Sequence, residues 1–561
     1  MKRKMIAIVL GLTMIVSSLA GCGSSDTTEK PTDKEVSQSS VEASQSSGTS
    51  SEVSEETVEL EEKTIQLWMV GPGKQKDSDM VWEAFNEKLQ EYVPNTTVEI
   101  SVFSDAEYKE KFNQMLASGE AVDCAWVGYQ IGNVDSFIAD GSLLPIDDML
   151  EQYGQGIIDF YGQDIIDFNA YTDGKQYCVS AWQGKVTGMW GLRVPNELAE
   201  LAGDTWIEDT QEIMSKWWNT KSTADDFQAV FDQIDIYCAA LKEAGKLYSG
   251  IDVRSVFQQN YAIRQSSSGK LQMNNIGVVG DDETFTVIDM IDTEHYRVYA
   301  KNMAEFYKKG YIRSDIASVD INTLTTVTNG EYTENTFILT AGGAIGSDES
   351  VKQSTTAKFG MDATVIRIED ADKGYYGSPR TNAMGFPYCA DEPERAMMVL
   401  NALFAEPELY QLLIYGIEGV HYTDNGDGTV TTPYGAQGKE NSDYGLWRWT
   451  IGTCINSLCD QTTTPGYYED LRKLEKEVSF CPFVKFVFDD SSVKAIISSL
   501  SAIDGEYKDM ISKGYTGDDW EATLDQWIAE RKEAGVDTLI AEYQKQLDAF
   551  IEENNITSWR E

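Results

Sequence analysis

Aromatic residues stand beside side chains with planar hydrogen-bonding groups at several points of the sequence. An aromatic face stacks on apolar C–H surfaces, while amide and guanidinium groups form hydrogen bonds with hydroxyl groups. This combination suits the binding of a polyhydroxylated, sugar-like ligand without any chemical change to it. The candidate ligand-binding residues are Trp126, Tyr129, Trp182, Gln183, Trp190, Tyr375, Tyr376, Arg380, Trp447, Arg448 and Trp449.

Several of these residues have an alternative structural role. Trp126 lies near the end of an apolar run (121–129) and could belong to the core, whereas Tyr129 follows Gly128 in a loop and is expected to face a ligand. Trp447 and Trp449 would share one face of a strand by period two. A packed tryptophan pair with an exposed Arg448 between them is the alternative for that segment.

The residues needed for common catalytic centres are scarce. Histidine occurs twice, as His295 and His421, which leaves little room for a Ser-His-Asp triad or a histidine-rich zinc site. The 92 acidic residues could supply the carboxylate pair of a glycosidase, so the amino-acid composition does not exclude glycosidase activity. We expect a protein that is not an enzyme and needs no metal or cofactor, with His421 as a structural hydrogen-bonding residue.

Two glycine-rich segments are better explained as turns and loops than as ligand motifs. TDNGDGT (423–429) has glycines where an EF-hand needs oxygen ligands, so Asp427 and Gly428 indicate a hairpin turn. TAGGAIGSDES (340–350) lacks the G-x-G-x-x-G spacing of dinucleotide-binding loops. We expect a strand at 337–340 that opens into a glycine-rich loop offering backbone N–H groups.

The N-terminus is typical of an exported chain. Lys2, Arg3 and Lys4 precede an apolar run of signal-peptide length that ends in Leu-Ala-Gly-Cys22. This ending resembles the lipobox of bacterial lipoproteins, which implies a signal peptide over 1–21 and lipidation of Cys22; an ordinary export signal is the alternative. Residues 22–62 are rich in Ser, Thr and Glu and predict a disordered acidic linker.

The net charge of −47 comes mostly from residues 63–561. Such a body repels nucleic acid and anionic membrane surfaces, so nucleic acid is excluded as a partner. Seven further cysteines show no CxxC spacing. Cys124 and Cys178 are expected to be buried. Cys454 and Cys459 could form a disulfide, with free thiols as the alternative.

The first part of the body alternates strands and helices. Strands are expected at 64–70, 97–103 and 121–129, with a helix capped by Ser78 and another starting at Asp105. This alternation predicts βαβ units and a parallel sheet, whose ligands bind beyond the carboxyl ends of the strands.

The order of segments resembles the extracellular solute-binding proteins of ABC importers, in particular the carbohydrate group. The carrying segments are VWEAFNEKL, YKEKFNQMLASGEAVDCAWV, FIADGSLLPID and DGKQYCVSAW in the first lobe. PERAMMVLNALF with YGIEGVHY, and FVFDDSSVKAIISSL with AEYQKQLDAFIEEN, resemble a large-lipoprotein branch with an additional C-terminal domain. The resemblance extends over nearly all of 63–555 and is weakest at 190–342.

The resemblance implies a type II periplasmic-binding-protein-like α/β fold, with two lobes, each a mostly parallel sheet flanked by helices, around a ligand cleft. It implies lobe 1 at 63–182 with a return segment at about 380–445, lobe 2 at 183–379, and a C-terminal region at 446–561 whose family-specific domain starts near 475. Trp182, Gln183 and Trp190 would then lie at the first crossing between lobes. Tyr375, Tyr376 and Arg380 would lie at the second, with an interlobe ion pair as the alternative for Arg380.

The functional expectation is a receptor on the outer face of the cell membrane, lipid-anchored and monomeric. It would capture a small soluble ligand, an oligosaccharide above all, by hinge closure and deliver it to an ABC transporter permease. A carbohydrate-holding surface adhesin, a peptide receptor and a secreted glycosidase remain alternatives.

Overall fold

The computed structural model describes residues 60–558 apart from short internal segments: 129–130, 132–133, 188–189, 218–222, 253–274, 280–284, 320–323, 327–329, 344–347, 368–374, 377–379, 381, 434–441, 461–462, 481 and 484. Cys22, the signal peptide and almost all of the acidic linker therefore lie outside the described residues. Within the described residues, no helix is both long and apolar enough to span a bilayer.

The described body begins with the expected βαβ units. Their elements are β1 (Lys63–Val70), α1 (Ser78–Leu89), β2 (Thr96–Phe103), α2 (Asp105–Ser118) and β3 (Cys124–Gly128). α1 buries Val81, Phe85 and Leu89, which the four-residue spacing places on one face. The predicted cap at Ser78 is wrong, since Asp77 is the N-cap and Ser78 is the first helical residue. The Ser78 hydroxyl accepts a hydrogen bond from the backbone N–H of Gln75 at 2.9 Å.

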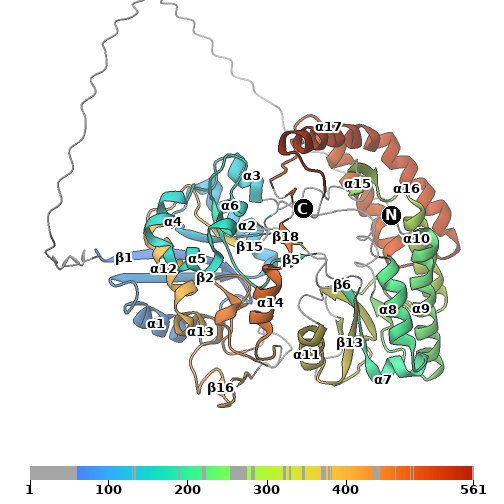
Figure 1. The fold of residues 1–561 in the computed structure, drawn as a ribbon, viewed down its shortest axis with the longest axis horizontal. Coiled ribbons are helices and arrows are strands. Elements are labelled where there is room, and N and C mark those ends of the chain that lie inside the picture. Colours follow the sequence, from blue (N-terminus) through green and yellow to red (C-terminus); the bar gives the residue numbers. More distant parts are fainter. Residues whose placement is uncertain are drawn as a thin grey trace, which may run out of the picture. The chain divides into compact units, whose positions relative to one another are not determined.

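Lobe 1, defined here as the elements around a five-stranded sheet, has the strand order β2-β1-β3-β15-β4 (Figure 1). β1 pairs in parallel with β2 and β3, whereas β15 (Asn382–Gly385) runs antiparallel to β3 and β4 (Cys178–Ser180). The chain enters this sheet again at Asn382, the first residue of β15. The other lobe-1 helices are α3 (Val134–Ala139), α4 (Asp147–Tyr153), α5 (Gln155–Tyr161), α6 (Gln163–Asn169), α12 (Pro393–Ala405), α13 (Pro407–Tyr415) and α14 (Tyr467–Glu475), with η4 at Cys454–Asn456.

Lobe 2 surrounds a four-stranded sheet with the order β13-β6-β12-β7. Its central strand β6 (Trp190–Pro195) is antiparallel to both β12 (Leu339–Gly343) and β13 (Ala363–Arg367), and only β12 and β7 (Ile251–Asp252) are parallel. The expectation of a mostly parallel second sheet was therefore wrong for the described strands. The lobe-2 helices are α7 (Asn196–Ala199), η1 (Glu200–Ala202), α8 (Trp206–Trp217), α9 (Ala224–Glu243), α10 (Glu294–Lys308) and α11 (Asp348–Phe359).

The predicted strand at 337–340 also differs from the structure. It is divided between β11 (Thr336–Phe337), which pairs with β10 (Thr325–Thr326), and β12. Gly342 and Gly343 continue β12 opposite Gly191 and Trp190, so they extend the sheet and do not open a loop. Residues 344–347 lie outside the described residues.

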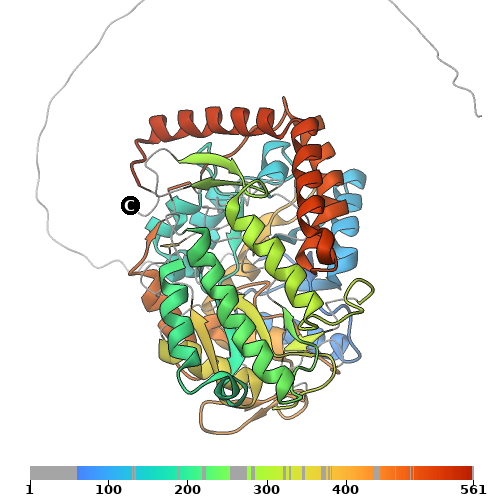
Figure 2. The ribbon, with the colours of Figure 1, turned by 90° about the vertical axis from the view of Figure 1, so that its right-hand side faces the viewer.

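A C-terminal module of three helices packs on lobe 2. In chain order these are α15 (Lys494–Ser512), α16 (Trp520–Ala534), which follows the short η5 (Gly517–Asp519), and α17 (Val536–Asn554). α15 and α16 contact α10 (Figure 2). α17 buries Leu539, Tyr543 and Leu547 against the hairpin of β8 (Ile276–Val279) and β9 (Thr286–Asp289). The expected docking helix at the C-terminus is confirmed.

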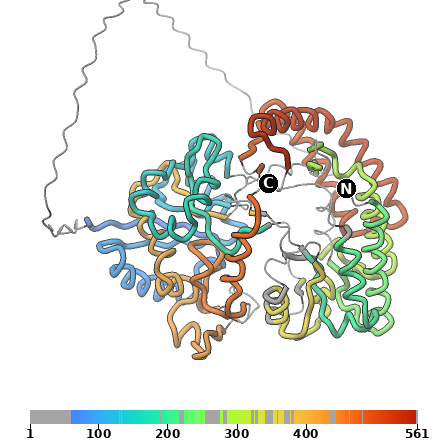
Figure 3. Tube along the Cα trace, viewed as in Figure 1, coloured from blue at the N-terminus to red at the C-terminus, as the bar shows by residue number. Residues whose placement is uncertain are grey.

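Three short strands gather where the chain passes between the two lobes. β5 (Val186–Thr187), β14 (Tyr375–Tyr376) and β18 (Ser479–Phe480) form one sheet in the order β18-β14-β5. In Figure 3 the orange part of the trace runs from lobe 1 towards the red C-terminal helices. β5 and β14 lie in the two segments for which crossings were predicted. β18 adds a third, which leads from α14 to the C-terminal module, and we call this the crossing sheet.

Two smaller expectations concern cysteines and the hairpin at Asp427. Cys124 and Cys178 are buried, as expected, and Cys454 and Cys459 are both free thiols. β16 (Thr423–Asp424) pairs antiparallel with β17 (Val430–Thr431), which confirms the hairpin.

Candidate functional site

The candidate site lies at one edge of the lobe-1 sheet. β3 ends at Gly128, and Asn382, the first residue of β15, is its partner in the ladder. β4 ends nearby at Ser180, before the chain continues to the crossing sheet. Because ligands of open α/β sheets bind beyond the carboxyl ends of the strands, this edge is where binding groups are expected.

Trp126 supports this edge from inside the core. Its side chain is fully buried, and its indole N–H donates to the side-chain oxygen of Asn382 at 2.7 Å. Its ring meets the rings of Tyr108 and Trp449 edge to face, at centroid distances of 5.6 and 6.2 Å. The structure therefore places Trp126 in the core position that the sequence left open as its alternative.

Trp447 and Trp449 form a stacked pair in front of Trp126. Their ring centroids are 5.5 Å apart, their planes differ by 16°, and both rings are half-buried. The segment is a turn and not a strand, so the pair arises from local chain reversal and not from strand periodicity. The side-chain amide of Asn382 donates to the backbone carbonyl of Trp449 and thereby ties this turn to Trp126. We call Trp447 and Trp449 the tryptophan platform.

Arg448 is turned away from solvent between the two tryptophans. Its guanidinium donates to the Tyr415 hydroxyl and to Asp460, both at 3.2 Å, and its side chain is 17% exposed. The alternative prediction that Arg448 is exposed is therefore wrong. Arg448 instead anchors the turn to α13 and to the segment after η4.

Arg380 is also buried, and its partners belong to lobe 1. It donates to Asp135 of α3 at 2.7 Å and to the carbonyl of Asn169 at 2.8 Å, and its guanidinium lies 5.8 Å from the ring of Tyr171. The ion pair thus joins two parts of one lobe, and the interlobe ion pair considered from the sequence is wrong. These contacts hold the start of β15 against α3 and α6.

Trp182 marks the exit from lobe 1 and is fully buried. Its indole N–H donates to both carboxylate oxygens of Glu475, at 2.9 and 3.0 Å, and its backbone bonds to Gly452 and Cys454. Gln183, the next residue, is exposed. Of these two predicted binding residues, Gln183 has a side chain open to a ligand in this structure.

Tyr376 is buried in the crossing sheet, where its ring packs against the neighbouring rings of Phe168 and Phe480. Tyr129 lies outside the described residues, as do the side chains of Trp190 and Tyr375. Their predicted roles stay predictions.

Sequence reasoning missed three polar residues that organise this region. Asn382 links Trp126 to the tryptophan platform, Glu475 holds Trp182, and Lys185 is 6% exposed just before β5. The Lys185 signal was present in SAWQGKVTGMW, where one charged residue interrupts an apolar crossing segment. No local pattern marks Asn382 or Glu475, whose partners are distant in the sequence.

His421 has the structural role expected of it. Its Nδ1 accepts a hydrogen bond from the backbone N–H of Ile417 at 3.0 Å, and its Nε2 lies 3.4 Å from Asp77. The ring is 2% exposed and closes the loop after α13.

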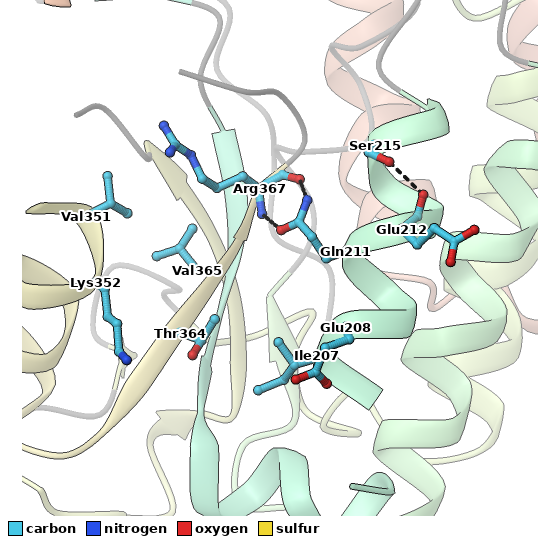
Figure 4. A pocket seen from close by; sticks show the side chains of 10 residues that line it. All are labelled: Ile207, Glu208, Gln211, Glu212, Ser215, Val351, Lys352, Thr364, Val365 and Arg367. Atoms are coloured by element: carbon cyan, nitrogen blue, oxygen red, sulfur yellow. Dashed lines mark hydrogen bonds between the residues drawn. The ribbon is translucent and has the colours of Figure 1, made fainter. Parts of the chain in front are cut away.

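Lobe 2 carries a cavity of about 590 Å³ along the outer edge of β13, between α8 and α11 (Figure 4). Gln211 of α8 binds the backbone of Arg367 in both directions, at 2.7 and 2.8 Å, and so joins the helix to the end of this strand. The described lining has an aliphatic floor, with polar side chains from both helices around it; it comprises Ile207, Glu208, Gln211, Glu212, Ser215, Val351, Lys352, Thr364, Val365 and Arg367. The cavity can hold a sugar-sized group, but this lining includes neither an aromatic ring nor a predicted binding residue.

Comparison with known proteins gives separate matches for the C-terminal module and for the larger part of the body. Residues 482–552 match a family described as a domain of unknown function, DUF3502. A curated carbohydrate ABC transporter substrate-binding protein of Streptococcus pneumoniae is 22% identical over 278 residues, which are 48% of this chain and 53% of the relative. The match therefore spans about half the length of this relative.

Similar solved structures cover almost the whole described body. The N-glycan transport solute binding protein NgtS of S. pneumoniae matches with a TM-score of 0.67 and 18% identity, over 87% of this chain and 99% of NgtS. The S. pneumoniae ABC-transporter substrate binding protein FusA, in complex with kestose, matches with a TM-score of 0.53 and 13% identity, over 88% of this chain and all of that chain. The described body has the α/β fold of solute-binding proteins, as the sequence resemblance implied.

Proposed function

We propose that this chain is the substrate-binding receptor of an ABC importer and that its ligand is an oligosaccharide. The receptor acts outside the membrane, captures the ligand between its lobes and presents it to a permease. Sugar-binding relatives and the tryptophan platform support this function. The curated relative is named a carbohydrate substrate-binding protein, and NgtS has also been solved with Man5GlcNAc.

The tryptophan platform is the observation that carries the proposal. Two parallel, half-buried indole rings sit at the edge of the lobe-1 sheet, and a hydrogen-bonded Asn382–Trp126 pair fixes their turn. A rigid aromatic surface is suited to the C–H face of a pyranose ring, since it loses little conformational freedom on binding. Gln183 supplies an exposed amide near the crossing for the hydroxyl edge.

Closure of the two lobes is the proposed mechanism. The crossing sheet joins the lobes through three strands of two residues each. Short connections of this kind can absorb the backbone rotation of a hinge, and a ligand that contacts both lobes favours the closed form by its differential affinity.

The anchor completes the proposed arrangement. Cys22 would be lipidated after removal of residues 1–21, and residues 22–62 would tether a monomeric receptor to the outer face of the membrane. Substitution of Cys22 by alanine should abolish incorporation of radiolabelled palmitate and release the protein from membranes. Retention of the label by the Cys22→Ala variant would contradict lipidation at this residue.

A thermal-shift screen against glycans and peptides tests the function, because a ligand that binds the native state raises stability by mass action. We expect stabilisation by a set of related oligosaccharides, contraction of the protein in small-angle scattering with those ligands, and no turnover. Trp447→Ala should weaken binding about tenfold, equivalent to about 1.4 kcal/mol. Trp520→Ala, at the start of α16, is the matched control and should leave the affinity unchanged.

Other outcomes would identify other functions. Binding without contraction indicates a module that holds a carbohydrate chain, stabilisation by peptides alone indicates a peptide receptor, and cleavage of oligosaccharides indicates a glycosidase. Each of these results would contradict the proposed import receptor for oligosaccharides.

A further inference from the structure

Lys185 is a buried lysine at the point where the chain leaves lobe 1. It is 6% exposed, follows the exposed Gln183 by two residues and directly precedes β5 of the crossing sheet. A lysine ammonium carries three hydrogen-bond donors and is among the groups least often buried without partners.

None of the residues that the structure describes accepts a hydrogen bond from this ammonium. The neighbouring anion is Glu475, whose carboxylate already receives the Trp182 indole, the backbone N–H of Lys185 and a guanidinium N–H of Arg472 at 2.8 Å. Arg472 and Glu475 therefore form a compensated ion pair. The positive charge of Lys185 is left in excess.

The remaining titratable groups that act on Lys185 are two thiols. Cys178 of β4 and Cys454 of η4 are buried, and burial raises the pKa of both, so both are uncharged near neutral pH. Burial also lowers the pKa of Lys185 to about 8, against the opposing effect of Glu475. The ammonium is thus held where its charged form is unfavourable, at the crossing where the proposed receptor closes on its ligand.

We propose that the Lys185 ammonium binds a carboxylate of the captured ligand, so that the ligand is an oligosaccharide containing an acidic sugar. This inference rests on the proposed function and narrows its substrate class. A hydroxyl group could accept a hydrogen bond from Lys185 but would leave its charge uncompensated, whereas a carboxylate supplies both acceptors and one negative charge. The acidic body does not prevent this, since charges more than about 8 Å away are largely screened at physiological salt.

The test compares saccharides that differ in one carboxylate. Suitable pairs are trigalacturonate and its methyl ester, 3′-sialyllactose and 3′-galactosyllactose, and xylotriose with and without a glucuronate branch. We expect calorimetry to show that the wild-type protein binds at least one acidic member tenfold or more tightly than its neutral partner. Lys185→Met should remove this preference at least tenfold while changing the affinity for neutral members less than twofold, and Lys185→Arg should restore part of it.

A second measurement separates recognition from a structural role. Because Lys185 has an uncompensated charge, Lys185→Met should leave the melting temperature of the unliganded protein unchanged or raise it. Lys175→Met, at an exposed lysine of the same lobe, should alter neither affinity nor stability. A lower melting temperature with unchanged acidic-sugar preference in Lys185→Met would overturn the inference.

The two proposals fail in different ways. If a broad glycan array finds neutral ligands that bind and no acidic ligand that binds more tightly than its neutral partner, the acidic-sugar inference is wrong and the receptor function stands. If no saccharide of either kind binds the wild-type protein, the proposed function is wrong and the inference falls with it.

Discussion

The indole N–H of Trp126 donates to the side-chain oxygen of Asn382 at 2.7 Å, across 256 residues of sequence. The amide of Asn382 then donates to the backbone of Trp449. One side chain thus connects the core tryptophan of β3 to the turn that carries the tryptophan platform, and this connection explains how a turn without regular structure is held at the sheet edge.

Asn382→Ala should therefore affect both stability and ligand binding. It leaves the buried indole N–H without an acceptor, which costs about 1–3 kcal/mol of unfolding free energy. It also removes the hydrogen bond to the Trp449 carbonyl, which holds the turn of the tryptophan platform. The affinity for the oligosaccharide ligand should therefore fall as well. Urea unfolding and calorimetry measure the two effects. Unchanged affinity in a folded Asn382→Ala protein would show that the platform does not depend on this link.

Glu475 has a comparable role at the crossing between the lobes. Its carboxylate binds Trp182, the backbone of Lys185 and Arg472 together. Glu475→Gln removes the anion that pairs with the half-buried Arg472 and lies beside the buried Lys185, so we expect a loss of about 3 kcal/mol. Chemical denaturation tests this, with Glu477→Gln at an exposed position beside the same helix as the control. Equal stability of the two variants would contradict the role assigned to Glu475.

The sequence predicted those parts of the fold that depend on local periodicity. The strands and helices from Lys63 to Gly128, the hairpin at Asp427 and the docking helix that ends the chain all have apolar residues at regular spacing. Their boundaries were correct to within a few residues. The antiparallel pairing of β6 with β12 and β13 could not be read in this way, because pairing direction depends on connections and not on spacing.

The candidate site was harder to predict because its residues are selected by long-range contacts. Aromatic type alone cannot distinguish Trp126 and Trp182, which are fully buried, from the half-buried Trp447 and Trp449. Arg380 and Arg448 were predicted to bind a ligand, but their guanidinium groups form hydrogen-bonded ion pairs with Asp135 and Asp460. Those partners lie 245 and 12 residues away along the sequence, and no sequence motif predicts either ion pair.

Arg531 should fix the C-terminal module to the β8–β9 hairpin. It is fully buried and donates two hydrogen bonds of 3.0 Å to Asp289 of β9 and a third to Asp504 of α15. Arg531→Met leaves both carboxylates buried without their cation, which should cost about 3–5 kcal/mol in denaturant unfolding.

A surface ion pair from the same region is the control. Arg297 binds Asp525 at 2.7 Å in a partly exposed position, so Arg297→Met should cost less than about 1 kcal/mol. A similarly small effect of Arg531→Met would mean that apolar packing alone holds the module.

The stability of the unliganded protein should depend on pH through Lys185. Its pKa is about 8 in the folded protein, below the ordinary value of 10.5 that it regains on unfolding. Between these values the unfolded state binds more protons than the folded state, so the Lys185 contribution to stability rises with pH. The unfolding free energy of the wild-type protein relative to Lys185→Met should therefore increase by about 2 kcal/mol from pH 7 to pH 9.5. Urea unfolding of both proteins at several pH values measures this difference and cancels the titration of groups that they share. A difference that is constant over this range would show that Lys185 is not held as an uncompensated buried cation.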